Sequence, residues 1–152
     1  MPTVSRSRLI AAPLESVWRL VRDPHNLPRW WPRVARVEDV RGEGNELRWT
    51  AVLRGESGSY VRADYRLTEL HPQAALAWAQ ELAGSPFERI LASSALAIEL
   101  SAAGEGTEVR LTAAERLRGI SRLGAPLLRG AAGRRLEEAL DGIELAVGGA
   151  SA

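Results

Sequence analysis

Short segments of alternating apolar and polar residues fill the middle of this 152-residue chain, and they constrain its fold more than any other feature. Turn-forming residues separate the segments at nearly regular spacing, at positions 42–45, 55–58, 84–86 and 104–106. Alternation with period two gives each strand one apolar and one polar face, and successive hairpins then share a dry side. We therefore predict a six-strand antiparallel meander over residues 34–117. The apolar faces of its clearest segments consist of Leu47, Trp49, Ala51 and Leu53; Val61, Ala63, Tyr65 and Leu67; and Val109, Leu111 and Ala113.

The dry face of such a sheet needs a cover, and the carboxyl-terminal region supplies it. Apolar residues recur there every three or four positions, from Leu128 through Leu136 and Leu140 to Val147, which is typical of an amphipathic helix. Before the meander, residues 4–10 are predicted as a strand, 13–22 as a helix and 24–31 as a short helix. The predicted fold is α+β: a strongly curved seven-stranded antiparallel sheet wrapped around a long helix over 125–147. Two short helices lie between the first two strands, and one domain spans residues 1–152.

Composition excludes several kinds of chemistry. The chain has no cysteine and only two histidines, His25 and His71, so thiol nucleophiles and sites built from three histidines are absent. We expect no metal and no cofactor. The formal charge of +1 gives no general attraction to nucleic acid, and we expect no nucleic-acid partner. No segment has the length and apolarity of a signal or a membrane span, so we expect a cytoplasmic protein without stable membrane insertion, as a monomer or weak homodimer.

Several residue patterns accompany this order of elements: Ile10-Ala11-Ala12-Pro13, Val17-Trp18, Asp23, Leu27-Pro28-Arg29-Trp30-Trp31-Pro32-Arg33-Val34, Gly106-Thr107-Glu108-Val109, Leu136, Leu140 and Ile143. Together they resemble the START-like, helix-grip (SRPBCC) superfamily, specifically its bacterial polyketide cyclase/dehydrase-like branch. The resemblance covers essentially the whole chain, and it implies a hydrophobic cavity between the sheet and the long helix that holds lipids, polyketides or related small molecules. It does not define an activity, because the superfamily contains carriers, receptors and cyclases.

Three aromatic residues, Trp49, Tyr65 and Trp78, fall on the apolar faces of neighbouring predicted strands. They can form rigid walls for a flat ligand, with the indole N–H and phenol O–H groups as polar handles. The alternative is that they fill the core. Small residues on the closing helix leave further volume for a ligand. The predicted pocket residues are Trp30, Trp49, Ala51, Ala63, Tyr65, Trp78, Gln80, Ser94, Leu128, Ala131 and Ala132.

Arginines crowd the beginning of the closing helix, and acidic residues follow later. This order opposes the helix dipole, so local helix stability does not explain it. We interpret Arg129 and Arg134 as a basic rim at the pocket mouth that attracts a carboxylate or phosphate head group. The alternative is an ordinary solvated helix face.

These features favour a module that binds a hydrophobic small molecule, as a carrier or sensor. One alternative is an aromatase/cyclase-like enzyme, in which Tyr65 would donate a proton and Arg89 would stabilise an enolate. No inward acid–base pair is visible in the sequence, and this counts against an enzyme. A second alternative is a role in binding another protein.

Overall fold

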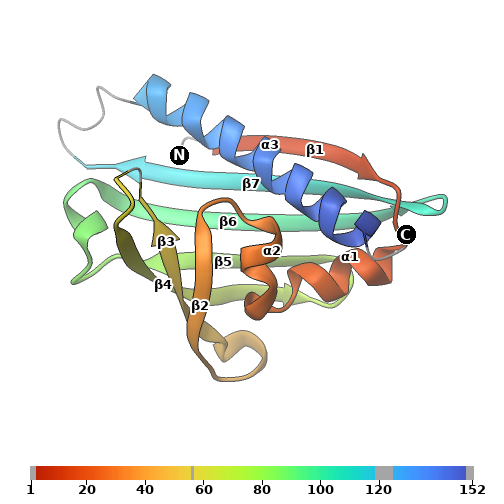
Figure 1. The fold of residues 1–152 in the computed structure, drawn as a ribbon, viewed down its shortest axis with the longest axis horizontal. Coiled ribbons are helices and arrows are strands. Elements are labelled where there is room, and N and C mark those ends of the chain that lie inside the picture. The colour runs from red at the N-terminus through yellow and green to blue at the C-terminus, as the bar shows by residue number, and fades with distance from the viewer. Residues whose placement is uncertain (1–2, 56, 119–124, 150–152) are drawn as a thin grey trace.

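The computed structural model describes residues 3–55, 57–118 and 125–149, which form one curved antiparallel sheet packed against helices (Figure 1). The seven strands follow the order β1-β7-β6-β5-β4-β3-β2, so the first two strands of the chain form the edges of the sheet. The strands are β1 (Thr3–Ile10), β2 (Val34–Arg41), β3 (Arg48–Arg54), β4 (Tyr60–His71), β5 (Ala75–Glu81), β6 (Leu91–Ala103) and β7 (Gly106–Leu117). The α-helices are α1 (Leu14–Val21), α2 (Leu27–Trp30) and α3 (Ala125–Gly149), and the short 3-10 turns are η1 (Pro24–Asn26), η2 (Gly44–Glu46) and η3 (Pro86–Arg89).

Interruptions in the strand register help to curve the sheet. The register shifts once between β4 and β5, once between β6 and β7 and twice between β2 and β3. Extra residues on one strand of a pair bend that strand and increase its twist. In Figure 1 the helix α3 runs diagonally across the sheet alongside β1 and β7, with α1 and α2 near its C-terminal half. The sheet therefore wraps around the helix without closing into a barrel.

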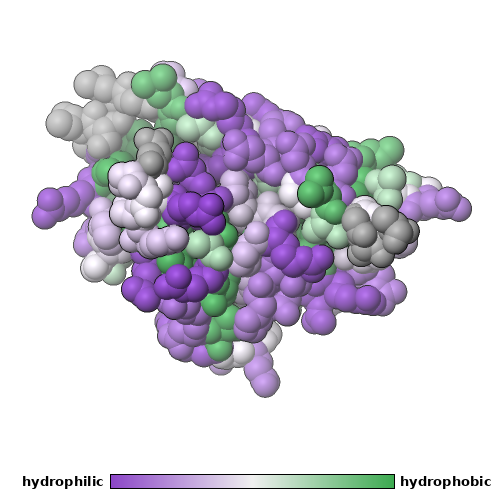
Figure 2. Space-filling view, in the orientation of Figure 1, coloured by the Kyte–Doolittle hydropathy of each residue, from purple (hydrophilic) through white to green (hydrophobic). Residues whose placement is uncertain are grey.

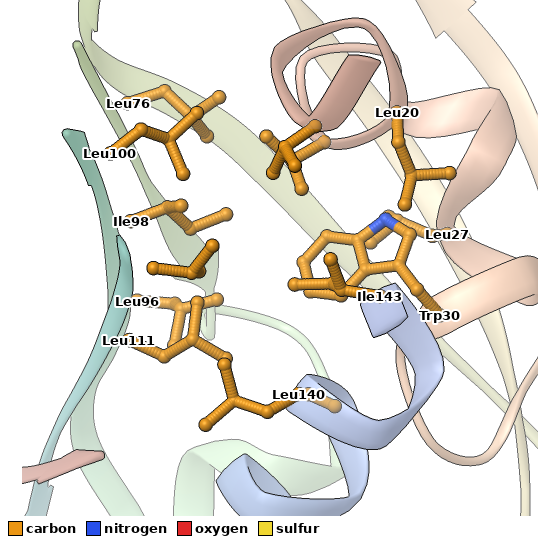
Figure 3. Close-up of a cluster of buried hydrophobic side chains, with 14 of the residues drawn as sticks. Leu20, Leu27, Trp30, Leu76, Leu96, Ile98, Leu100, Leu111, Leu140 and Ile143 are labelled. Atoms are coloured by element: carbon orange, nitrogen blue, oxygen red, sulfur yellow. The ribbon is translucent and has the colours of Figure 1, made fainter. Parts of the chain in front are cut away.

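The solid part of the core lies between the sheet and the C-terminal half of α3. Leu140 and Ile143 of this helix have no exposed surface. Figure 3 shows both residues facing Leu96 and Leu111 of the sheet, with Trp30 of α2 beside Ile143. Apolar burial on this scale is the main stabilising contribution to a domain of this size, so this half of α3 is held firmly in place.

The N-terminal half of α3 is much less buried. Residues 126–131 are exposed except for Leu128, which is half-buried, and the Leu127 side chain is 81% exposed. Figure 2 shows hydrophobic atoms where α3 begins, a mainly hydrophilic surface along its outer side and a smaller hydrophobic spot towards its C-terminal end, where Leu145 is 80% exposed. This half of the helix covers the sheet without filling the space beneath it, as the geometry of the site shows.

Two glycines of α3 allow close packing. A Cβ atom at Gly142 would lie 2.7 Å from the Cα atom of Trp30, and one at Gly133 would lie 2.6 Å from a guanidinium nitrogen of Arg6. Glycine at position 133 thus leaves space for the Arg6 side chain of β1. This contact explains the glycine without reference to a ligand.

The predicted fold class is confirmed. The structure has the seven-stranded antiparallel sheet, the two short helices between the first and second strands and the long C-terminal helix. None of the helices in the described part of the chain has both the length and the apolar character that crossing a membrane requires.

Candidate functional site: a cavity between the sheet and the long helix

A cavity of about 390 Å³ lies between the concave face of the sheet and the first half of α3. This volume falls within the range of about 300–1,000 Å³ that is usual for small-molecule sites. The outer part of its wall comes from the facing ends of β3 and β4, from η3 and from the beginning of α3, and we call this part the mouth. The mouth residues are Arg33, Leu53, Arg54, Val61, Phe87, Ile90, Leu91 and Leu128.

The inner end of the cavity is aromatic and apolar. Trp49 is 2% exposed, and its ring centroid lies 5.6 Å from that of Trp78 in an edge-to-face arrangement. Trp31 packs edge-on against Trp78 from the other side, with centroids 6.2 Å apart. Aromatic pairs in this geometry contribute beyond the area they bury, so these contacts stabilise the wall. The remaining inner residues are Leu27, Leu96 and Ala113.

A row of polar side chains crosses the concave face between the mouth and the inner end. Tyr65 on β4 pairs directly with Gln80 on β5, and Ser94 on β6 pairs directly with Glu115 on β7. Ala79 pairs with Ala95, so Gln80 and Ser94 occupy the next position in the same register. All four side chains belong to the cavity wall. We call these four residues, together with Arg135 of α3, the polar belt.

An ion pair closes the polar belt. A guanidinium nitrogen of Arg135 donates to the Glu115 carboxylate at 2.8 Å, and the hydroxyl of Ser94 reaches the other carboxylate oxygen at 3.5 Å. The side chains of Glu115 and Arg135 are 12% and 36% exposed. Because Glu115 has little contact with bulk solvent, the charge on Arg135 replaces the hydration that the carboxylate loses.

Tyr65 stands between the aromatic wall and the ion pair. Its ring stacks on Trp49 with centroids 5.9 Å apart and an interplanar angle of 15°. Burial raises the pKa of Tyr65 to about 12; the charge on Arg135 lowers this pKa and that on Glu115 raises it, both less strongly than burial. The hydroxyl therefore keeps its proton at neutral pH and can donate a hydrogen bond to a ligand.

The structure brings together most of the predicted pocket residues on the cavity wall. This is a statement about their position, and their contact with a ligand stays a prediction. The predicted residues that line the cavity are Trp49, Ala51, Tyr65, Trp78, Gln80, Ser94 and Leu128.

The other predicted pocket residues lie elsewhere. Trp30 is 2% exposed and packs in the core beneath α3, and its neighbour Trp31 lines the cavity instead. Ala63 and Ala132 are 1% and 3% exposed and do not line the cavity. Ala131 faces solvent, because it occupies the outer side of α3.

The predicted charged residues also lie away from the cavity wall. Arg129 and Arg134 are exposed on α3, and Arg89 is exposed on η3. The arginines on the wall are Arg33 and Arg54 at the mouth and Arg135 in the polar belt. Arg129 and Arg134, which were predicted to form a basic rim, therefore have no direct contact with the cavity.

Sequence reasoning missed the Glu115–Arg135 pair, although a signal for Glu115 was present. The alternation of Val109, Leu111 and Ala113 continues to Glu115, which places this carboxylate on the inner face of β7. Arg135 lies seven residues after Leu128, two turns further along the same helix face. An inward-facing ion pair that the sequence did not reveal is therefore present.

The described residues contain no group of three or more His, Asp or Glu side chains arranged to hold a metal ion. His25 lies on the surface, where its Nδ1 atom is 2.8 Å from the Asp23 carboxylate. The same carboxylate accepts a hydrogen bond from the backbone N–H of His25 and so caps the short turn η1. The polar side-chain groups on the cavity wall are those of the polar belt, the indole nitrogens and, at the mouth, the guanidinium groups of Arg33 and Arg54.

Comparison with known proteins identifies the family. The family described as "Polyketide cyclase / dehydrase and lipid transport" matches residues 1–148, so this chain belongs to it. The resemblance to the START/SRPBCC superfamily inferred from the sequence is confirmed. No curated protein matches the sequence.

Solved structures share the fold over nearly the whole chain. The crystal structure of the protein TTHA0849 from Thermus thermophilus is similar with a TM-score of 0.80 and 26% identity, over 99% of this chain and 100% of that one. A START superfamily protein from Mycobacterium smegmatis gives a TM-score of 0.77 at 14% identity, over 95% and 96% of the two chains. The Zhui aromatase/cyclase from Streptomyces sp. R1128 gives 0.75 at 19% identity, over 94% and 91%. At identities this low, the last two likenesses show the fold alone.

Proposed function

We propose that this protein binds an apolar small molecule, such as a lipid or a polyketide, inside the cavity and acts as its carrier or sensor. The observation that carries the proposal is a cavity of about 390 Å³ enclosed largely by aromatic and aliphatic side chains. Burying an apolar ligand there gains roughly 25 cal/mol for each Å² removed from water, before the entropic cost of binding. The family description, which includes lipid transport, supports this class of ligand.

The test is native mass spectrometry of the purified protein, followed by extraction and identification of any retained small molecule. We expect a co-purifying hydrophobic molecule in the wild type. Ser94→Leu places an isobutyl group in the cavity and should lower its occupancy at least tenfold. Ser101→Leu makes the same change on the exposed face of the same strand and should leave occupancy unchanged. Equal occupancy in the two variants would contradict binding in this cavity.

A second candidate is an aromatase/cyclase-like enzyme acting on a polyketide. The observation that favours it is that Arg135 lies on the cavity wall with Tyr65, whereas Arg89 does not. The ion pair with Glu115 counts against this role, because the carboxylate already neutralises the charge that would stabilise an enolate. The pKa of about 12 for Tyr65 counts against it, since a general acid works best with a pKa near the operating pH. We therefore prefer the carrier or sensor. Formation of a cyclised product from a poly-ketone by the wild type, and its loss in Tyr65→Phe without loss of binding, would reverse this preference.

A further inference from the structure

The polar belt divides the cavity into two apolar parts. On its inner side lie Trp78 and Leu96, which pair with each other across β5 and β6. On its outer side lie Leu53 and Val61, which pair across β3 and β4 near the mouth. A ligand that fills the cavity therefore meets apolar side chains on both sides of the polar belt, with the guanidinium groups of Arg33 and Arg54 at the mouth.

The charges of the polar belt cancel. Glu115 and Arg135 are in contact at 2.8 Å, and the other three side chains of the polar belt, Tyr65, Gln80 and Ser94, are uncharged at neutral pH. A ketone or hydroxyl can exchange hydrogen bonds with such a row at little cost. A ligand carboxylate loses its hydration when it enters the cavity. Because Arg135 is already paired with Glu115, no free positive charge in the polar belt compensates for this loss.

We propose that the polar belt selects a neutral polar group, a ketone or a hydroxyl, within an otherwise apolar ligand, and that the Glu115–Arg135 pair excludes carboxylates from this position. The proposal deepens the proposed function and rests on it. Glu115 is accordingly a specificity-determining residue. Its negative charge cancels the positive charge that would otherwise draw anions into the cavity.

The experiment uses four compounds with one ring skeleton: fluorene, 9-fluorenone, 9-fluorenol and fluorene-9-carboxylate. Their affinities for the wild-type protein are measured by isothermal titration calorimetry. We expect 9-fluorenone and 9-fluorenol to bind at least tenfold more tightly than fluorene and the carboxylate. If fluorene binds as tightly as 9-fluorenone, the polar belt does not recognise the polar group and this inference is overturned, while the proposed function stands. If none of the four binds, the proposed function fails as well.

Charge variants test the ion pair separately. Glu115→Gln leaves the positive charge of Arg135 uncancelled, so the affinity for the carboxylate relative to 9-fluorenone should rise at least tenfold. The double variant E115Q/R135Q is again neutral and should return this ratio to the wild-type value. Arg129→Gln on α3 is the matched control and should change the ratio less than twofold, since Arg129 is exposed to water and does not line the cavity. An unchanged ratio in Glu115→Gln, with the urea midpoint confirming that the variant folds, would overturn the role of Glu115.

Discussion

Gly142 on α3 lies directly against the backbone of Trp30 on α2. A Cβ atom added at Gly142 would lie 2.7 Å from the Cα atom of Trp30. Gly142→Ala should therefore push the two helices apart and destabilise the fold by about 1–3 kcal/mol, because a packed backbone cannot yield as a flexible side chain can. Gly130→Ala on the same helix is the control. There the added Cβ would be 3.6 Å from the nearest atom, and the better helix propensity of alanine should stabilise by about 0.5–1 kcal/mol. Urea unfolding measures both, and equal effects would contradict the close packing at Gly142.

Tyr65 should make stability depend on pH in the alkaline range. Burial raises its pKa from the ordinary value of 10.0 to about 12, so the folded state holds the phenolic proton more tightly than the unfolded chain does. This contribution is complete below pH 10 and is lost as the pH rises through 12. Over that interval the wild type should lose roughly 2–3 kcal/mol more than Tyr65→Phe. Tyr60→Phe, at a side chain that is 59% exposed, should follow the wild type in urea unfolding series.

At the scale of elements, Arg8 ties β1 to the C-terminal half of α3. Its guanidinium group contacts the carboxylates of Asp141 at 2.5 Å and Glu137 at 2.8 Å. Arg8→Gln should cost about 1 kcal/mol, the upper end for a pair near the surface, because several charges form a network here. The loss should shrink in 1 M NaCl. Arg19→Gln removes an isolated exposed pair with Glu15 and should have little effect on the free energy of unfolding at any salt concentration. If Arg19→Gln lost as much stability as Arg8→Gln, the network around Arg8 would contribute no more than an isolated surface pair.

The elements could be predicted because each leaves a local signal. Period-two alternation and regularly spaced turns indicated the strands, and a three-to-four-residue apolar repeat indicated α3. The site depended on tertiary contacts that no local pattern reports. Which of Trp30 and Trp31 faces the cavity is decided by the close packing of α2 against Gly142, and the partner of Glu115 lies twenty residues away on another element.

For the whole molecule, the two halves of α3 have different roles. Its C-terminal half belongs to the solid core, where Leu136 and Leu140 have no exposed surface, whereas its N-terminal half covers the cavity and reaches the sheet through Arg135. A ligand must pass between this N-terminal half, the facing ends of β3 and β4, and η3, because these elements form the mouth. Segments with few buried contacts open most readily.

Hydrogen exchange monitored by mass spectrometry can locate this opening. In the free protein, residues 126–135 should exchange faster than residues 136–147 of the same helix, because most of the buried apolar side chains of α3 belong to the latter segment. Adding 9-fluorenone at a hundred times its measured dissociation constant should slow exchange in residues 126–135, 53–61 and 86–91, since opening then requires the ligand to leave. Residues 136–147 should change little. If protection instead appeared along β1 or in residues 136–147 alone, the binding site would lie outside this cavity. The N-terminal half of α3 would then not cover the ligand.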